Sequence, residues 1–329
     1  MENHFYQSRK TCSRELGVQT KPFRFGVTSY GAKNGDEWVR KLRRAEELGY
    51  SSLFVSDHFM GQISTIPALA FAAAASSRLR VGSIVCSNDF RHPILLAKEA
   101  ATIDMLSGGR FELGLGAGFL KAEYDAIGIP FEDAGVRIGT LTELIQIIKA
   151  YFNVGPINFT GKFYRIQSEK GLDRIPEPVQ KPHPPLLIGG GCRRMLTLAG
   201  REAGIVSLTL KVNKDGTGPD MEAARLPLDQ KIDWICSGAG ERFEDIELNV
   251  QTWAVAVTDN CKEVIAQFAE QFPLPYEILS SLPFLLIGTI EEIIEQIQTC
   301  RLRYGISYFL IFDQYMEQFA PVLVALAGK

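Results

Sequence analysis

The sequence predicts an α/β protein of the (β/α)₈ class, a TIM barrel with insertions, on three observations. Eight short segments of the 329-residue chain are almost continuously apolar, as parallel strands covered on both faces are. Segments with apolar residues at helical spacing follow most of these strands. A doubly wound open sheet would show the same alternation, so the count of eight strands favours the closed barrel.

The expected strands are short apolar runs, most of them followed by a loop of small residues. In chain order they are Phe23–Tyr30, Ser51–Ser56, Val81–Ser87, Phe111–Leu115, Pro185–Ile188, Ile205–Leu210, Ile246–Val257 and Tyr308–Phe312. The expected helices are Asp36–Leu48, Ile66–Ser77, Pro93–Leu106, Gly139–Phe152, Arg193–Ala203, Leu228–Ser237 and Ile290–Cys300. In the first helix, Trp38, Leu42 and Ala45 recur at helical spacing. Asp36 fits its N-cap, and Gly49 fits its end.

Two insertions interrupt this rhythm. Gly155–Ser168 alternates between apolar and polar residues like a β-hairpin, and Pro273–Gly288 is punctuated by prolines. The sequence shows no internal repeat beyond the βα unit and no low-complexity tract. We therefore expect one barrel domain over residues 22–329, preceded by a polar tail at 1–21.

The composition excludes several classes of protein. A net charge of −3 argues against nucleic acid as a partner. The cysteines are scattered without a C-x-x-C pair, which argues against a disulfide scaffold or a zinc site, and no other metal-ligand spacing is present. The longest apolar run, Ile66–Ala75, is too short to cross a bilayer, and the first 21 residues lack the apolar core of a secretion signal. We expect a cytoplasmic protein with no membrane partner.

A barrel enzyme places its chemistry at the carboxyl ends of the strands, and Asp57-His58-Phe59 follows the second strand directly. His58 is where such an enzyme would place a proton donor or a partner of a hydride site. Asp57 would then hold the imidazole in one tautomer by accepting its other N–H. The alternative is a structural histidine at the start of a loop, satisfied by Asp57.

The end of the third strand combines small, polar and charged residues. We expect Val85, Cys86, Ser87 and Asn88 to lie against a planar ring. His92-Pro93 fits a helix start and is interpreted as structural.

Glycines mark the ends of two further strands. Gly114, Gly116 and Gly118 alternate at the end of the fourth strand, where a backbone without side chains can approach something bulky. Phe119 stands where a dinucleotide fingerprint needs its last glycine, so a Rossmann site is rejected. Gly189–Gly191 opens a helix beside two arginines and fits either a phosphate cradle or a tight βα turn. No nucleophile or metal motif is present, so a bound cofactor must supply the reactivity.

Several short motifs are weak signals one by one, but their order along the chain and their places at the strand ends make the combination specific for a family. They are Ser56-Asp57-His58-Phe59, Asn88-Asp89-Phe90-Arg91-His92-Pro93, Gly114 to Tyr124, Gly128-Ile-Pro-Phe131, Pro184 to Gly191 and Gly305-Ile-Ser-Tyr308. On these motifs the chain, from Phe23 to its end, resembles the bacterial luciferase-like monooxygenase superfamily, and within it the branch of oxidoreductases that depend on the deazaflavin F420. The resemblance implies a barrel that binds reduced F420 or reduced FMN across its mouth.

The resemblance also implies roles for individual residues. Ile84-Val85-Cys86 would form a bulge, often with a non-proline cis peptide, that bends the cofactor ring, and His58 would contact this ring. Gly116, Ala117 and Gly118 would pass near the cofactor. The run Gly189, Gly190, Gly191 would meet its phosphate.

Two positions depart from the sugar-phosphate dehydrogenases of this superfamily. Phe119 stands where they have a glutamate acid, and Gln62 stands where they have a tryptophan. A sugar phosphate is therefore not the expected substrate. The aromatic residues near the strand ends suggest a fairly apolar pocket for a small organic molecule, with walls from Phe59, Phe119, Tyr124 and Trp253.

Three functions remain open at this point. The favoured one is hydride transfer between F420 and a small organic substrate, with His58 and Asp57 as catalytic residues. The first alternative is a monooxygenase that uses O₂ and reduced FMN delivered by a separate flavin reductase. The second is a flavin-binding protein without catalysis. The resemblance further implies a homodimer formed through the second and third helices.

Overall fold

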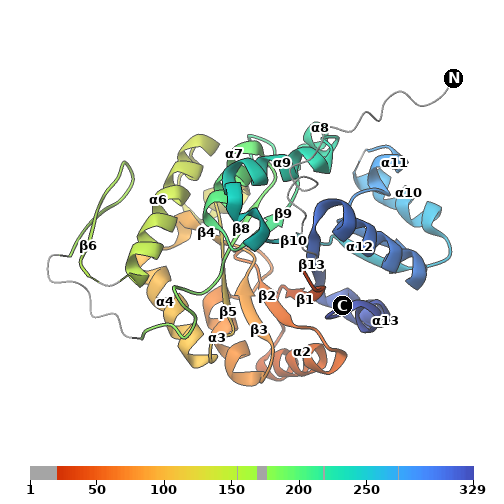
Figure 1. The fold of residues 1–329 in the computed structure, drawn as a ribbon, viewed down its shortest axis with the longest axis horizontal. Helices are drawn as coiled ribbons and strands as arrows, with labels where there is room; N and C mark the ends of the chain where they lie inside the picture. Colours follow the sequence, from red (N-terminus) through yellow and green to blue (C-terminus); the bar gives the residue numbers. More distant parts are fainter. Residues whose placement is uncertain (1–20, 154, 169–175, 218, 273) are drawn as a thin grey trace.

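The computed structural model describes residues 21–153, 155–168, 176–217, 219–272 and 274–329. The polar tail expected at 1–21 lies outside these residues, apart from Lys21. Within the described part, one sheet of parallel strands forms the centre, and helices surround it (Figure 1).

The central sheet closes on itself. Its strands are β1 (Arg24–Ser29), β2 (Ser52–Val55), β3 (Arg80–Ser83), β4 (Cys86–Ser87), β5 (Phe111–Gly116), β8 (Leu186–Gly190), β9 (Ile205–Leu208), β10 (Glu247–Gln251) and β13 (Ile306–Phe312). All neighbours are parallel; β1 pairs with β13, and β5 pairs with both β3 and β4. The third strand of the barrel is thus split in two, and the expected barrel of eight parallel strands is confirmed.

Helices surround the barrel and its insertions (Figure 1). They are α2 (Gly35–Leu48), α3 (Thr65–Ala75), α4 (Pro93–Leu106), α5 (Lys121–Ile127), α6 (Ala134–Phe152), α7 (Arg193–Glu202), α8 (Met221–Ala224), α9 (Leu228–Ala239), α10 (Cys261–Gln271), α11 (Tyr276–Leu279), α12 (Ile290–Tyr304) and α13 (Met316–Leu326). The helix expected from Gly139 begins five residues earlier, at Ala134, and the helices α10 and α13 were not expected from the sequence. Among the described residues, no helix is both long and apolar enough to cross a bilayer.

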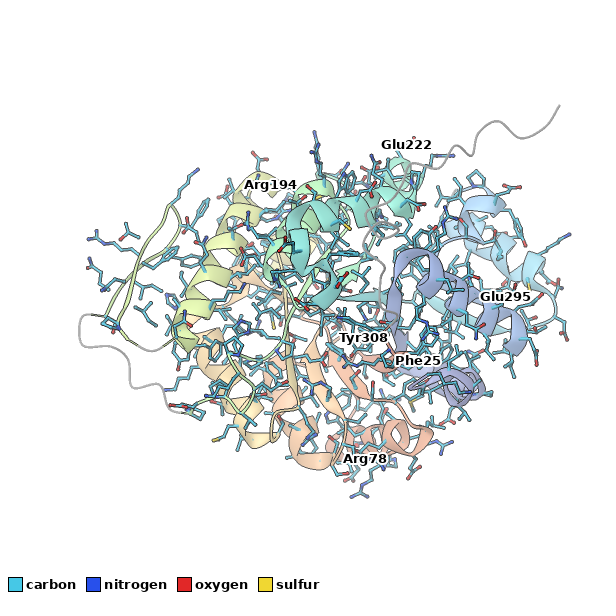
Figure 2. All side chains as sticks on the ribbon, viewed as in Figure 1. Phe25, Arg78, Arg194, Glu222, Glu295 and Tyr308 are labelled. Carbon is cyan, nitrogen blue, oxygen red and sulfur yellow. The ribbon has the colours of Figure 1, made fainter. Side chains whose placement is uncertain are left out.

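Alternation along the strands separates two cores. In β13, Tyr308 and Leu310 belong to a small cluster inside the barrel, whereas Phe309 and Ile311 belong to the large cluster between sheet and helices. Figure 2 shows Tyr308 and Phe25 near the centre, and charged side chains such as Arg194 at the periphery. The barrel interior is therefore packed with side chains and is not a pore.

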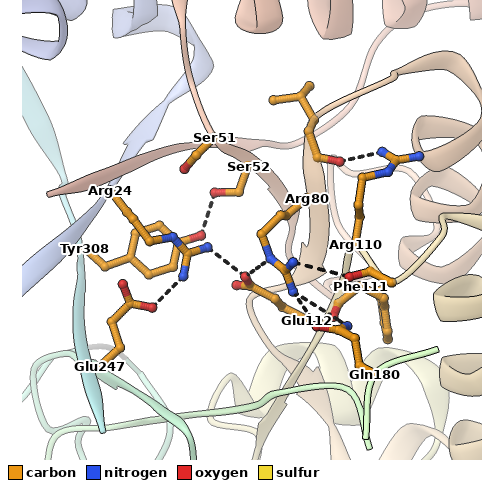
Figure 3. A network of polar contacts seen from close by, with 12 residues as sticks. Arg24, Ser51, Ser52, Arg80, Arg110, Phe111, Glu112, Gln180, Glu247 and Tyr308 are labelled. Atoms are coloured by element: carbon orange, nitrogen blue, oxygen red, sulfur yellow. Dashed lines mark hydrogen bonds and ion pairs between the residues drawn. The ribbon is translucent and has the colours of Figure 1, made fainter. Parts of the chain in front are cut away.

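A polar layer lies at the amino ends of the strands (Figure 3). Glu112 accepts from Arg24 at 2.7 Å and from Arg80, and Arg24 also pairs with Glu247 at 2.5 Å. The Arg24 guanidinium stacks over the Tyr308 ring, 4.1 Å from its centre. Because these charges are partly or fully buried, their pairing compensates each of them at this end of the barrel, and removal of one partner would leave an uncompensated buried charge. The chemistry is expected at the opposite end.

The insertions are partly as expected. β6 (Ile157–Thr160) and β7 (Arg165–Ser168) form the antiparallel hairpin, which projects beyond α6 in Figure 1. The expectation of one seventh strand over Ile246–Val257 was wrong. β10 ends at Gln251, and β11 (Ala254–Val257) pairs instead with β12 (Leu285–Gly288) in a separate two-stranded sheet. β11 is itself wholly apolar and follows β10 after two residues, so hydrophobicity did not reveal the break between the two strands.

Candidate active site

His58 lies in the loop that follows β2, at the carboxyl end of the barrel, and a glutamate from α5 holds it. Its Nδ1 is 2.8 Å from Oε2 of Glu123. The other oxygen of Glu123 accepts the backbone N–H groups of Phe59 at 3.1 Å and of Met60 at 3.4 Å. The imidazole is about one quarter exposed, and Glu123 is buried. Among the described residues, no hydrogen bond is recorded for Nε2 of His58.

Asp57 does not hold the imidazole, so this expectation was wrong. Its carboxylate forms two bonds with the guanidinium of Arg91, one of them at 2.9 Å. It also accepts from the hydroxyl of Thr65 at 2.8 Å and from the backbone N–H of Ser87 at 3.2 Å. Asp57 thus ties the loop of His58 to the third strand. Both residues lie in the loop after β2, which ends at Val55, and there the Asp57 side chain turns toward Arg91 while the His58 side chain turns toward Glu123.

The third strand carries the bulge that the resemblance implied. The Ile84–Val85 peptide bond is cis, which confirms that expectation. The Val85 side chain lies over the neighbouring strand, where a Cβ on Gly116 would stand 2.4 Å from its Cγ2. A Cβ on Gly189 would stand 3.4 Å from its Cγ1. The glycine at 116 therefore makes room for Val85, and Val85 stands at the mouth of the barrel above the inner cluster.

Cys86 and Ser87 present no free side-chain group at the mouth. Cys86 belongs to the outer core, and burial raises the pKa of its thiol to about 12. The Ser87 hydroxyl lies 3.1 Å from that of Tyr124. Both residues were expected among the cofactor contacts, but Cys86 is 0% and Ser87 only 5% exposed, and the Ser87 N–H already donates to Asp57.

Asn88 carries an unsatisfied polar atom. It is 1% exposed, and its Nδ2 donates to Asp89 at 2.8 Å. Its Oδ1 is buried without a hydrogen-bond partner among the described residues. Because a buried acceptor normally finds a donor, this atom fits a donor from a bound ligand.

Tyr124 is part of the support beneath the glycine loop, and not of a pocket wall, so this expectation was wrong. It is 1% exposed, and its hydroxyl donates to Asp89 at 2.8 Å. Gly118 has a φ of 65°, and a Cβ there would lie 1.8 Å from the Tyr124 oxygen. Arg137 of α6 holds the same loop by donating to the carbonyl of Ala117 at 3.1 Å.

The glycine run at the carboxyl end of β8, Gly189 to Gly191, serves packing at two of its three positions. A Cβ on Gly190 would meet Met195 at 2.7 Å, and a Cβ on Gly191 would meet the backbone of Leu210 at 2.3 Å. The first N–H groups of α7 nevertheless have no side-chain cap, since the N-cap residue Cys192 supplies none. The tight-turn interpretation thus explains Gly190 and Gly191. The amino end of α7 still offers backbone N–H donors to an anion.

The aromatic residues differ in position. Phe119 is 38% exposed and meets the His58 ring edge-on, with ring centres 5.6 Å apart. Phe59 is 53% exposed and packs edge-on against Phe90. Trp253 stacks with two phenylalanines of the separate two-stranded region, Phe272 and Phe284. Of the four residues expected to line the pocket, Phe119 is therefore the one whose ring contacts His58 directly.

The family model of the luciferase-like monooxygenases matches residues 15–274 of this sequence. The chain belongs to the luciferase-like monooxygenase family. This confirms the resemblance inferred from the strand-end motifs, and the family's barrel is the fold observed.

Curated relatives of this luciferase-like protein include enzymes named for two cofactors. An F420-dependent glucose-6-phosphate dehydrogenase of Amycolatopsis mediterranei is 31% identical over 169 residues, 48% of each chain. The 5,10-methylenetetrahydromethanopterin reductase of Methanopyrus kandleri is 29% identical over 239 residues, 69% of this chain and 64% of that one. An FMNH₂-dependent dimethylsulfone monooxygenase of Pseudomonas putida is 33% identical over 128 residues, 39% and 34% of the two chains. The matched stretches thus span about a third to two thirds of these relatives.

Solved structures share the fold of this family member. The F420-dependent tetrahydromethanopterin reductase of Methanopyrus kandleri superposes with a TM-score of 0.71 at 19% identity, covering 92% of this chain and 99% of that one. An F420-dependent secondary alcohol dehydrogenase, solved with an F420-acetone adduct, superposes with a TM-score of 0.73 at 17% identity, covering 93% and 99%. At these identities the likeness establishes the barrel alone.

Glu123 is the site residue that sequence reasoning missed. In the sequence, Glu123 belongs to the segment that follows the glycine loop, and its neighbour Tyr124 is the residue of this segment that we expected in the site. A signal was present, because Glu123 is an acidic residue within the first turn of a short helix that begins after a strand end. Its partner His58 is 65 positions away, so local spacing did not connect them.

Proposed function

We propose that this luciferase-like protein is an F420-dependent oxidoreductase that transfers a hydride to or from a small, fairly apolar organic substrate. The observation that carries the proposal is His58, held through Nδ1 by Glu123 at the carboxyl end of β2 with Nε2 left unbonded. An imidazole in this state can exchange a proton with a substrate at Nε2. The names of the F420-dependent relatives support the choice of cofactor.

The residues at the rim fit a flat anionic cofactor. Val85 supplies a surface for one face of a ring, and the orphan Oδ1 of Asn88 needs a donor such as a ring N–H. The uncapped start of α7 offers backbone N–H groups to a phosphate. Arg193 and Arg194, in the first turn of α7, add positive charge beside these N–H groups.

The proton moves through His58. When bound, the cofactor supplies the site that gives or takes the hydride. When an alcohol is oxidised, Nε2 of a neutral His58 accepts the hydroxyl proton as the hydride leaves the adjacent carbon; in reduction the proton returns from Nε2. Glu123 stabilises the imidazolium that forms, because its carboxylate contacts Nδ1.

The surroundings of His58 favour an apolar substrate. The Phe119 ring meets the imidazole edge-on and is 38% exposed, so it presents an apolar surface beside His58. Gln62 accepts from Ser56 at 2.6 Å and lines a groove of about 520 Å³ between the loops after β1 and β2. We therefore propose a small alcohol or ketone, bound against Phe119.

Anaerobic titration tests the cofactor, and a histidine variant tests the chemistry. We expect micromolar binding of F420 and weaker binding of FMN, followed through the absorbance of each ring. His58→Ala should retain F420 binding and lose hydride transfer to a panel of small alcohols and ketones by about 10²–10⁴-fold. The matched control is His183→Ala, since His183 precedes β8 and lies toward the opposite end of the barrel. Binding of FMN without binding of F420 would reverse the proposal.

A second candidate is a monooxygenase that uses O₂ and reduced FMN from a separate reductase. The similarity to an FMNH₂-dependent monooxygenase favours it. In that case the apolar rim around Phe119 would exclude water from the reduced flavin. Uptake of O₂ in proportion to product, with reduced FMN present and F420 absent, would establish this function.

A further inference from the structure

Glu123 uses its two carboxylate oxygens for different partners. Oε2 faces the imidazole of His58, while Oε1 faces two backbone N–H groups of the same loop, those of Phe59 and Met60. The residue is 3% exposed, so water does not compete for either oxygen. The helix α5 that carries it is short and ends at Gly128, a glycine with positive φ.

We propose that Glu123 is a positioning residue that sets the tautomer of His58. An ionised carboxylate has only acceptor atoms, so the proton of a neutral imidazole must lie on Nδ1 for this contact to form. Nε2 then carries the lone pair. The geometric argument is independent of the reaction, and only the effect on turnover depends on the proposed function.

The backbone partners make an amide at this position informative. In Glu123→Gln, the two backbone N–H groups of Phe59 and Met60 need an acceptor, and only the amide oxygen can serve. The amide nitrogen must then face His58 and donate to Nδ1. The tautomer inverts, the proton moves to Nε2, and a neutral His58 can no longer accept a proton from a substrate there.

The tautomer can be read without cofactor or substrate. Ring ¹⁵N NMR of the full chain, labelled at histidine and recorded at pH 9, distinguishes protonated from lone-pair nitrogens. We expect the Nδ1–H form of His58 in the wild type and the Nε2–H form in Glu123→Gln. His58→Asn identifies the signal. An unchanged tautomer in a folded Glu123→Gln variant would overturn the inference.

Two further variants complete the test. Glu123→Asp keeps a carboxylate, so we expect the Nδ1–H form to persist even where the loop is loosened. Asp125→Asn is the matched acid-to-amide control on the same helix, because Asp125 is exposed and pairs only with Lys121 in the described structure. It should change neither the tautomer nor the thermal midpoint of unfolding.

The kinetic consequence separates this inference from the proposed function. With F420 and an alcohol, Glu123→Gln should lower kcat by about 10²-fold or more with little change in KM. If Glu123→Gln shows the inverted His58 tautomer but the wild type has no activity with F420, the proposed function is wrong and the role of Glu123 stands. An active wild type whose Glu123→Gln variant keeps full kcat and the Nδ1–H form would sink the role of Glu123 alone.

Discussion

The carboxylate of Asp57 lies against the guanidinium of Arg91, and not against the imidazole of its neighbour His58. Oδ1 stands 2.9 Å from Nη2, and a second bond joins Oδ2 to Nη1. Both side chains are largely buried, with 9% of Asp57 and 17% of Arg91 exposed. Asp57 therefore anchors the segment from which His58 projects, and it acts on His58 only through the backbone they share.

Removal of Arg91 should destabilise the protein strongly. Arg91→Leu leaves a buried carboxylate without its counter-charge, and we expect a loss of about 3–5 kcal/mol in the free energy of unfolding. Urea denaturation measures it. The matched control is Arg44→Leu, which removes an exposed pair with Glu317 and should cost far less. Equal losses in the two variants would contradict a structural role for the Asp57–Arg91 pair.

Gly118 should tolerate alanine much less than another glycine of similar backbone conformation. Both Gly118, with φ of 65°, and Gly128, with φ of 73°, are in the left-handed region, where alanine costs about 1–2 kcal/mol. Only at Gly118 does the new Cβ meet an atom, the Tyr124 oxygen at 1.8 Å. Gly118→Ala should therefore lose about 1–3 kcal/mol more than Gly128→Ala in denaturant unfolding. Losses of the same size would show that the Tyr124 contact does not matter.

Gly116 and Val85 should be energetically coupled. A Cβ on Gly116 overlaps Cγ2 of Val85 at 2.4 Å but stands 3.6 Å from its Cβ. Gly116→Ala should cost about 1–3 kcal/mol of unfolding free energy, and Val85→Ala in the same chain should recover much of this loss. Gly189→Ala is the control, because its Cβ would only reach ordinary contact with Val85 at 3.4 Å. Additive losses in the double variant would rule out the coupling.

The buried Lys231 should make the free energy of unfolding depend on pH in the alkaline range. It is 2% exposed, its Nζ donates to the carbonyl of Thr209 at 3.1 Å, and burial lowers its pKa from 10.5 to about 8. Below pH 8 the folded state carries a buried charge that the unfolded state solvates, so the wild type loses up to about 3 kcal/mol there. As the pH rises from 8 toward 10.5, the unfolded state binds more protons than the folded state, and this cost disappears.

Lys231→Met checks this sign. The variant should gain free energy of unfolding over the wild type at pH 7, and the gain should shrink between pH 8 and pH 10. The exposed Lys98→Met should leave the pH profile unchanged. A Lys231→Met variant that is less stable than the wild type at every pH would refute the prediction.

The barrel was predictable because its signals are local. These strands bury both faces, so the runs before Asp57 and around Phe111 and Tyr308 are mostly apolar, with Glu112 and Ser307 as buried polar exceptions. The break after Gln251 was not predictable on these grounds, because β11 is also apolar although it belongs to a separate sheet. Likewise, composition assigns Tyr124 equally to a pocket or to a core, and only the contact with Asp89 places it in the core.

The order of the barrel strands, most of the helices between them, and the loop that carries His58 were determined by the sequence itself, since apolar periodicity and strand-end glycines belong to neighbouring residues. The partner of His58 was decided only by the tertiary structure. Asp57 is adjacent in the chain but turned toward Arg91, whereas Glu123 is 65 positions away and lies 2.8 Å from Nδ1. The physical reason is that a side chain's direction depends on the backbone that carries it, and the approach of α5 to the loop after β2 exists only in the closed barrel.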